Sequence, residues 1–333
     1  MTSTYRAVML TRVGGPEVLQ VVELPVEEPA PGQLRVRVRA AGVGSTDLAM
    51  LAGHYPYAPP MPFVPGYEVA GVVDAIAAGV TGFELGQRVA ALTVHGGYGE
   101  LVVSAAEHFL PIPDGVCDVD AAAVILNFVT AWQMIYRIAK VQPGQSALVT
   151  GAAGGVGTAL LQLLRLARAR TYGAASATKH GTVRSLGATP IDYRAGALDV
   201  LTTAVEPSGV DHVFDAIGGA NIGLCIGAAR RGGMVVGYGF MGAAGKVATL
   251  AMFLNLFVGS RLRGRRGIFY GITMRYRKDP TPLREDLPRI LGLVADKSID
   301  PLVTHTFELL DARRALELLA TGSVEGKIVL TNA

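Results

Sequence analysis

The sequence predicts an α/β protein in which a doubly wound parallel sheet is inserted into a β-rich, partly open barrel. Three observations support this prediction. An apolar run at residues 147–150 passes through a glycine-rich turn into a helical pattern at 158–169. Strand-like and helical segments then alternate, which is typical of a parallel sheet covered by helices. The first third of the chain contains instead short strand-like runs separated by glycines and prolines.

The first third is predicted to form the β-rich unit. Residues 6–22 alternate as in a hairpin, with a Gly-Gly-Pro turn at 14–16. Residues 34–41 alternate arginine and valine, which is typical of a strand with one face in water. Residues 42–53 turn into a short helix, and residues 55–65 form a loop with five prolines. Further strands are expected at residues 69–78, 88–94 and 99–103.

The middle of the chain is predicted to form the parallel sheet. From about residue 119 the sequence changes to long helical stretches, and residues 306–332 return to strand, helix and strand. We expect the last segment to rejoin the first unit. The predicted domains are therefore residues 1–125 plus 300–333 for the substrate domain and 126–299 for nucleotide binding. The expected parallel strands are residues 147–150, 171–175, 189–191, 210–215 and 234–238.

The glycine-rich turn is the first candidate site. A strand that passes through glycines into a helix directs unpaired N–H groups and the positive end of the helix dipole at one point, which suits a pyrophosphate. Such turns also occur without a ligand. Here the preceding strand, the long helix and a second strand at 171–175 favour a Rossmann-type dinucleotide-binding unit. We expect Gly154, Gly155 and Val156 to contact the cofactor.

The end of the second predicted strand discriminates between the two common dinucleotides. NAD-selective units carry an acidic residue there, which binds the ribose hydroxyls. This chain has no Asp or Glu between Asp120 and Asp192. The strand is followed instead by Ser176 and Lys179, a hydroxyl and an ammonium that suit a 2′-phosphate. A lysine at a helix start is commonly only solvated, so these residues alone disfavour an NAD-selective unit and leave a 2′-phosphate site open.

Composition limits the class of protein. The chain has 333 residues and a formal charge of +3, which suits two domains and indicates no nucleic-acid partner. Its two cysteines, Cys117 and Cys225, are far apart and form neither a disulfide framework nor a metal cluster. The N-terminal residues lack the apolar core of a signal peptide, and apolar runs such as 121–129 are too short to span a bilayer. We expect a soluble, cytoplasmic protein.

Several motifs resemble those of the medium-chain dehydrogenase/reductase family, and the resemblance covers essentially the whole chain. They are QPGQ at 142–145, AAGGVG at 152–157 and GKIVL at 326–330. Within the zinc-free quinone oxidoreductase branch, the vesicle amine transport protein 1 homologue subgroup is most similar, through NFVTAW at 127–132, ASATKH at 175–180 and PIDYR at 190–194. The resemblance implies a GroES-like domain, a Rossmann domain, a cofactor in the cleft between them, and a homodimer.

The resemblance also identifies where zinc-dependent members hold their metal. They use a cysteine in a GxCxxD motif and a histidine in a GHE motif, and here Gly44 and Tyr67 occupy these positions. Zinc needs three or four converging N or S donors, and no other set of Cys and His occurs in this region. We therefore expect no metal. An asparagine is typical of quinone reductases at the Gly44 position, so the orientation of a substrate is not defined by the motif.

The resemblance also implies individual cofactor contacts and, with the missing acid, NADPH as the cofactor. It places Thr130 at the nicotinamide end of the cofactor, and Ser176, Lys179 and Tyr193 at the 2′-phosphate of NADPH. It places Gly239 and Phe240 where the sixth strand leads to the nicotinamide.

Without a metal, hydride transfer to an electrophilic carbon is the favoured chemistry. A quinone or an α,β-unsaturated carbonyl compound accepts hydride and collects charge on oxygen. Tyr55 matches the tyrosine that related enoyl thioester reductases use as an acid, and a phenol can donate to an enolate. Alternatively, Tyr55 only lines the pocket and water supplies the proton. Both roles stay open.

The stretch 261–278 contains six arginines, one lysine and no acid. It would suit an acidic carrier protein, coenzyme A or an anionic membrane surface. A solvated face beside a dimer interface, with residues 268–270 as an edge strand, is favoured. The alternatives to an NADPH-dependent quinone or enone reductase are a non-catalytic nucleotide-binding adaptor, a membrane-associated protein and a tailoring enzyme of secondary metabolism.

Overall fold

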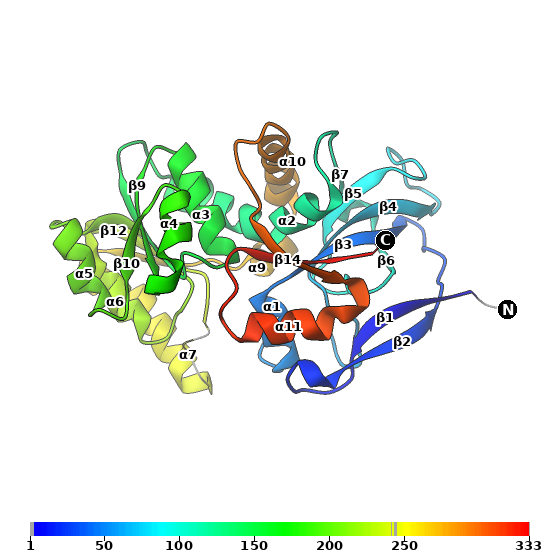
Figure 1. The fold of residues 1–333 in the computed structure, drawn as a ribbon, viewed down its shortest axis with the longest axis horizontal. Helices are drawn as coiled ribbons and strands as arrows, with labels where there is room; N and C mark the ends of the chain where they lie inside the picture. The colour runs from blue at the N-terminus through cyan, green and yellow to red at the C-terminus, as the bar shows by residue number, and fades with distance from the viewer. Residues whose placement is uncertain (1–2, 241, 243–244, 333) are drawn as a thin grey trace. The chain divides into compact units, whose positions relative to one another are not determined.

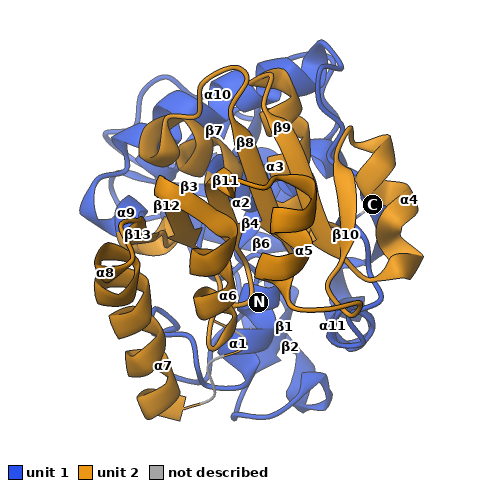
Figure 2. Cartoon of the chain, turned by 90° about the vertical axis from the view of Figure 1, so that its left-hand side faces the viewer, with its two compact units in different colours: residues 1–129, 275–333 blue, residues 130–274 orange. Residues whose placement is uncertain are grey.

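The computed structural model describes residues 3–240, 242 and 245–332. The chain divides into two compact units, which are coloured separately in Figure 2 and labelled by element in Figure 1. Unit 1 combines Met1–Val129 with Arg275–Ala333, and unit 2 is Thr130–Met274. The predicted fold class is confirmed, because a parallel sheet domain interrupts a β-rich domain.

The main sheet of unit 1 has the strand order β14-β15-β3-β4-β5-β7, and β6 also pairs with β3. In β3 the valines are buried and the arginines lie on the wetter face, as the alternation predicts. The last strand pairs antiparallel with β3, with Ile328 opposite Val43, so the C-terminal segment does return to the first unit. The strands are β3 (Gln33–Val43), β4 (Glu68–Ile76), β5 (Arg88–Leu92), β6 (Leu101–Ala105), β7 (Phe109–Pro111), β14 (Val303–Glu308) and β15 (Lys327–Thr331).

A separate hairpin and several helices complete unit 1. The hairpin pairs β1 (Thr4–Leu10) with β2 (Leu19–Pro25) across the predicted glycine turn. The sequence-based division assigned residues 275–299 to the nucleotide domain, whereas the contacts assign them to unit 1, where α10 packs against β7. A helical pattern does not indicate which sheet a helix covers. The helices are α1 (Ser45–Leu51), α2 (Asp118–Trp132), α9 (Ile272–Lys278), α10 (Thr281–Ala295) and α11 (Ala312–Ala320); α2 and α9 cross the boundary between the units.

Unit 2 is built on a six-stranded parallel sheet with the order β10-β9-β8-β11-β12-β13. The direction of winding reverses between β8 and β11, which is where ligands bind in doubly wound folds. The strands are β8 (Ser146–Thr150), β9 (Arg170–Ala175), β10 (Thr189–Asp192), β11 (Val210–Asp215), β12 (Ala229–Gly237) and β13 (Arg266–Phe269). The helices are α3 (Gly155–Leu166), α4 (His180–Ser185), α5 (Leu198–Val205), α6 (Asn221–Ala228), α7 (Gly245–Leu254) and α8 (Ser260–Leu262).

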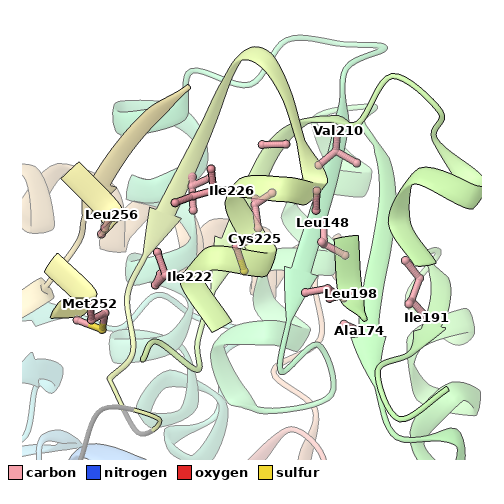
Figure 3. Close-up of a cluster of buried hydrophobic side chains, with 14 residues drawn as sticks. Leu148, Ala174, Ile191, Leu198, Val210, Ile222, Cys225, Ile226, Met252 and Leu256 are labelled. Carbon is pink, nitrogen blue, oxygen red and sulfur yellow. The ribbon is translucent and has the colours of Figure 1, made fainter. Parts of the chain in front are cut away.

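A buried apolar cluster joins this sheet to its helices (Figure 3). Leu148 and Val213 come from the central strands, and Ile222 and Ile226 from α6; all are essentially inaccessible to water. Each such side chain contributes roughly 1.5 to 3 kcal/mol to folding. The cluster therefore fixes the strand ends from which the glycine-rich turns emerge.

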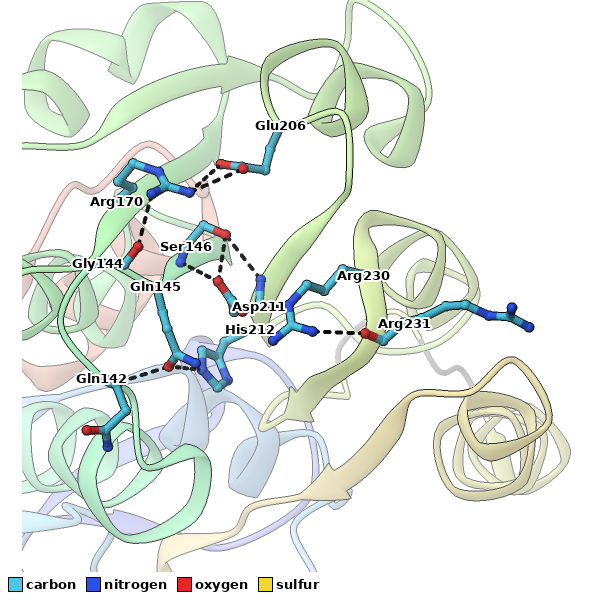
Figure 4. Close-up of polar contacts among 10 residues, drawn as sticks. All are labelled: Gln142, Gly144, Gln145, Ser146, Arg170, Glu206, Asp211, His212, Arg230 and Arg231. Atoms are coloured by element: carbon cyan, nitrogen blue, oxygen red, sulfur yellow. Dashed lines mark hydrogen bonds and ion pairs between the residues drawn. The ribbon is translucent and has the colours of Figure 1, made fainter.

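Polar contacts join the amino ends of the same strands (Figure 4). The Asp211 carboxylate accepts hydrogen bonds from the Ser146 amide at 2.8 Å, the Ser146 hydroxyl at 3.1 Å and Arg230 Nε at 2.6 Å. His212 Nε2 donates to Gln145 Oε1 at 2.9 Å. These contacts join β8, β11 and β12 at their amino ends.

The apolar segment around residues 121–129 is part of a longer helical region than the sequence suggests. Asp118–Ala139 is one continuous region, long and apolar enough by composition to cross a membrane. Within the described residues, 78% of its apolar window is buried, as in the core helix of a soluble protein.

Candidate nucleotide site and tyrosine pair

The glycine-rich turn after β8 leads tightly into α3. Gly151 has a positive φ of 61°, and its carbonyl accepts a hydrogen bond from the Gly154 amide at 2.9 Å. A Cβ on Gly157 would lie 2.2 Å from that carbonyl oxygen, so only glycine allows the helix to pack so closely on the turn. The first amides of α3 begin at Gly155 and have no partners within the helix. The predicted residues Gly154, Gly155 and Val156 therefore lie at a helix N-terminus, next to the point between β8 and β11 where the winding reverses. The unpaired amides of such a helix N-terminus fit a pyrophosphate.

The second predicted group lies at the carboxyl ends of β9 and β10. Ala175 is paired with Asp192 in the parallel register, so Ser176 and Tyr193 follow side by side. Tyr193 is half exposed, and Lys179 ends the short turn that begins after Ser176. The strand register thus brings together Ser176 and Tyr193, which are 17 positions apart in the sequence.

The structure adds Arg194 to this group. Its guanidinium lies 5.7 Å from the centre of the Tyr193 ring, and the Asp192 carboxylate accepts a hydrogen bond from the Arg194 amide. The sequence signal for Arg194 was present in the PIDYR motif, but a single arginine after a strand is common on surfaces. Only the packing of Arg194 on the Tyr193 ring distinguishes it from an ordinary surface arginine.

Three further predicted residues belong to unit 2. Thr130 is 4% exposed, and its hydroxyl has no hydrogen-bond partner among the described residues. An unpartnered buried hydroxyl is costly unless a ligand satisfies it. A Cβ on Gly239 would lie 1.7 Å from the Ala216 carbonyl oxygen, so the loop after β12 lies directly on the loop after β11. Phe240 packs partly against the apolar cluster.

Asp215, which the sequence analysis did not single out, shapes the loop at the switch point. It is fully buried at the end of β11. Its carboxylate accepts hydrogen bonds from Thr150 Oγ1 at 2.7 Å, Asn221 Nδ2 at 2.6 Å and the Gly218 amide at 2.7 Å. These bonds hold the loops after β8 and β11 next to each other. An acidic residue at the end of an apolar strand was the available signal.

In unit 1 the structure pairs Tyr55 with Tyr67. Their hydroxyl oxygens are 2.6 Å apart, and their rings meet edge to face at 6.0 Å between centres. Tyr67 is 2% exposed, and its backbone carbonyl accepts hydrogen bonds from the amides of Thr93 and Val94. Burial raises the pKa of Tyr67 well above its usual range, and its neighbour Tyr55 adds to this effect. Tyr67 therefore stays protonated at neutral pH.

Buried charged side chains lie beside the tyrosine pair. Glu68 and Lys327 are 1% and 3% exposed and form an ion pair that joins β4 to β15. Asp47 is fully buried, and its Oδ2 accepts a hydrogen bond from the Gly44 amide at 2.9 Å. Burial raises the pKa of Asp47 to about 6, although the Gly44 amide and Lys327 act in the opposite direction. A Cβ at Gly44 would meet no atom closer than 3.9 Å.

The charged side chains around Gly44 and Tyr67 do not resemble a metal centre. Among the described residues, no group of three or more His, Cys, Asp or Glu side chains converges as metal ligands would. Lys327 forms an ion pair with Oε1 of Glu68, the residue that follows Tyr67.

The proline loop also borders a cavity of about 800 Å³ within unit 1. Its lining includes Pro56, Tyr57 and Thr93, and the Arg277 guanidinium lies 5.5 Å from the centre of the Tyr57 ring. The Tyr57 ring also contacts the Tyr55 ring edge to face. This volume is within the range of small-molecule sites.

The basic stretch does not form one element. Its residues are divided among α8, the edge strand β13 and α9. Residues 268–269 belong to the edge strand, whereas Tyr270 is 1% exposed and donates a hydrogen bond to Gln133 Oε1 at 2.8 Å. Arg265 Nε donates to the Ala229 carbonyl at 2.9 Å, so at least one of these cations has a structural role.

The fold and the nucleotide site define a two-domain protein with a dinucleotide-type parallel sheet. The family description "Alcohol dehydrogenase GroES-like domain" matches residues 30–114, and "Zinc-binding dehydrogenase" matches residues 186–330. The chain belongs to the medium-chain dehydrogenase/reductase family, a family of oxidoreductases, as its resemblance predicts.

Individual relatives support this assignment. The chain is 32% identical to a zebrafish (Danio rerio) protein named "Synaptic vesicle membrane protein VAT-1 homolog", over 99% of the chain and 70% of that protein. It is 36% identical to the human protein of the same name, over 77% of the chain and 63% of that protein. The crystal structure of Escherichia coli quinone oxidoreductase complexed with NADPH covers 98% of the chain and all of that protein, with 26% identity and a TM-score of 0.89.

Proposed function

We propose that this protein is an NADPH-dependent reductase that transfers hydride to a quinone or to an α,β-unsaturated carbonyl compound. The observation that carries the proposal is the group at the ends of β9 and β10, where Ser176, Lys179 and Tyr193 gather with no acidic residue on the second strand. A carboxylate there would select the unphosphorylated cofactor, whereas these donors suit a 2′-phosphate.

The residues present fit this cofactor in two further respects. The α3 N-terminus would hold the pyrophosphate, and the buried Thr130 hydroxyl has an unused hydrogen-bond capacity. Gly239 and Phe240 would border the nicotinamide end, as the resemblance implies. When bound, NADPH supplies the hydride.

We propose that unit 1 supplies the proton and the space for the acceptor. Of the two roles of Tyr55 that the sequence leaves open, we favour proton donor, because its hydroxyl is held by a buried tyrosine. The cavity beside the proline loop is lined by Tyr57, whose ring contacts Tyr55, and would accommodate part of the acceptor.

The test is to mix the protein with NADPH or NADH and a panel of quinones and enones, and to follow the nicotinamide absorbance. We expect oxidation of NADPH with at least one acceptor and a clear preference for NADPH over NADH. Binding of NADPH without turnover of any acceptor would favour a non-catalytic adaptor. A preference for NADH would contradict the cofactor assignment.

We further propose a cytoplasmic homodimer. The strand β13 lies at the edge of its sheet and packs against the helical segment Asn255–Gly259 that follows α7. Helix α7 exposes large apolar side chains, among them Val247 at 84% and Leu250 at 61%. An unpaired edge beside an apolar face is typical of an interface between subunits. Light scattering should give twice the chain mass for the wild type and a smaller particle for Leu250→Glu.

A further inference from the structure

Two segments at the amino ends of β12 and β13 lie against each other. The pairing of β12 with β11 is interrupted after Ala229 and resumes at Met234, so residues 230–233 bulge away from β11. The Gly232 amide donates a hydrogen bond to the Gly264 carbonyl at 2.8 Å. This bond joins the bulge of β12 to the residues that precede β13, and both segments contain arginines.

Three arginine side chains lie around this contact, and we call them the arginine cluster: Arg231, Arg263 and Arg265. Arg231 Nε lies only 3.7 Å from the place where a Cβ on Gly264 would be. Partial burial lowers the pKa of Arg265, and the charges of Arg231 and Arg263 act in the same direction. The three guanidinium groups are therefore close enough to repel one another.

The backbone orients one member of the cluster and leaves another free to reach a ligand. Arg265 Nε donates to the Ala229 carbonyl at 2.9 Å, and its Nη1 donates to the Arg263 carbonyl at 2.6 Å. The exposed Arg231 side chain extends away from the polar contacts around Asp211 (Figure 4). A guanidinium that is already oriented loses less conformational entropy when it binds a ligand.

No acidic side chain neutralises the arginine cluster. The sequence has no Asp or Glu between Asp215 and Asp279. The Asp211 carboxylate, on the neighbouring strand, accepts hydrogen bonds from Arg230 and Ser146. In the part of the chain that the structure describes, no ion pair joins a member of the cluster to an acid. Like charges held together in this way raise the local positive potential, which an anion would neutralise.

We propose that the arginine cluster is a binding site for a phosphoryl group, separate from the nucleotide site. Guanidinium groups donate pairs of hydrogen bonds to phosphate oxygens and remain charged at neutral pH. The cluster lies at the amino ends of the parallel strands, whereas the N-terminus of α3 lies at their carboxyl ends. This inference goes beyond hydride transfer and does not depend on it. A soluble phosphate compound and a lipid headgroup both carry a phosphoryl group, and the experiment distinguishes these two sources.

The experiment is a calorimetric titration of the protein with inorganic pyrophosphate at constant ionic strength, with and without saturating NADPH. We expect binding in both conditions. Arg231→Gln and Arg263→Gln should each weaken the pyrophosphate affinity about tenfold, because each removes a charged hydrogen-bond donor. Both variants retain every backbone carbonyl of the two segments, and their NADPH affinity should equal that of the wild type. Arg184→Gln is the matched control, since it removes an exposed arginine of α4 outside the cluster.

Three results would overturn the proposal. The first is no pyrophosphate binding by the wild type, and the second is an equal affinity in the wild type and both cluster variants. The third is loss of binding in the presence of NADPH, which would assign the pyrophosphate to the α3 N-terminus.

Sedimentation with phosphatidylcholine vesicles, with or without phosphatidic acid, identifies the source of the phosphoryl group. Cosedimentation that requires phosphatidic acid, that pyrophosphate reverses and that Arg231→Gln weakens would assign a lipid headgroup. Pyrophosphate binding without cosedimentation would assign a soluble ligand. Cosedimentation that pyrophosphate does not reverse would contradict a phosphoryl site at the cluster.

Discussion

At the amino end of the parallel sheet in unit 2, side chains join neighbouring strands, whereas at the carboxyl end the strands run into glycine-rich turns. Asp211 and Ser146 satisfy each other's hydrogen-bonding groups at the first end. At the other end, Gly151 and Gly239 bring backbones into close contact, and the first amides of α3 have no helical partners. The amino ends of the strands therefore maintain the fold, whereas the carboxyl ends keep their donors available for a ligand.

The largest effect is expected at the carboxyl end. In Gly157→Ala the new Cβ would lie 2.2 Å from the Gly151 carbonyl oxygen, so α3 must move away from the turn. We expect NADPH affinity to fall about a hundredfold or more, because the helix N-terminus is displaced. Fluorescence titration measures this, with Gly181→Ala as the control, since a Cβ there meets no atom within 4 Å. Equal NADPH affinities in the two variants would show that the glycine turn does not contribute to cofactor binding.

A smaller and more selective effect is expected at Lys179. Replacing it with Gln removes the ammonium that we assign to the 2′-phosphate. NADPH affinity should fall about thirtyfold and NADH affinity should stay the same, as expected for one charge-assisted hydrogen bond. Arg184→Gln, at the other end of α4, removes a positive charge without this role and should change neither affinity. An equal loss for both cofactors in Lys179→Gln would contradict the assignment.

The amino end should respond in stability and not in binding. Asp211→Ala leaves the amide of Ser146, which is 2% exposed, without its acceptor. We expect a loss of about 1 to 2 kcal/mol in the free energy of unfolding, with NADPH affinity unchanged. Asp211→Asn keeps an acceptor for this amide and should lose less. If Asp211→Ala lowered the NADPH affinity and left the free energy of unfolding unchanged, the amino ends of the strands would contribute to binding and not to stability.

The sequence predicted the features that depend on local pattern. The glycine turn, the alternation of strands and helices, and the return of residues 327–331 to the first unit all follow from spacing and composition. The grouping of Ser176 with Tyr193 needed the resemblance, because parallel register cannot be deduced from either strand alone.

The features that were missed depend on contacts between distant segments. Glu68 and Lys327 are 259 positions apart, and neither has a pattern that indicates a buried partner. Tyr67 was considered only as a replaced zinc ligand, since the sequence does not reveal that its hydroxyl meets Tyr55. Arg194 and Asp215 are single polar residues at strand ends, where most such residues are simply solvated.

A stability effect of similar size, but one that develops only as the pH falls, is expected from His212 at the amino ends of the strands. His212 is 5% exposed, and its Nδ1 has no partner among the described residues, so burial lowers its pKa to about 4. The unfolded chain has a pKa near 6.5 and binds more protons between pH 6.5 and 4, so stability should fall as the pH falls through this window. Between pH 7 and pH 5, His212 should account for about 1 to 2 kcal/mol of that fall. Urea unfolding of His212→Asn should therefore show a shallower pH dependence than the wild type, with the same NADPH affinity. An identical pH dependence of stability in the two proteins would mean that His212 has the same pKa in the folded and the unfolded chain. Water would then reach the amino ends of these strands more than their contacts indicate.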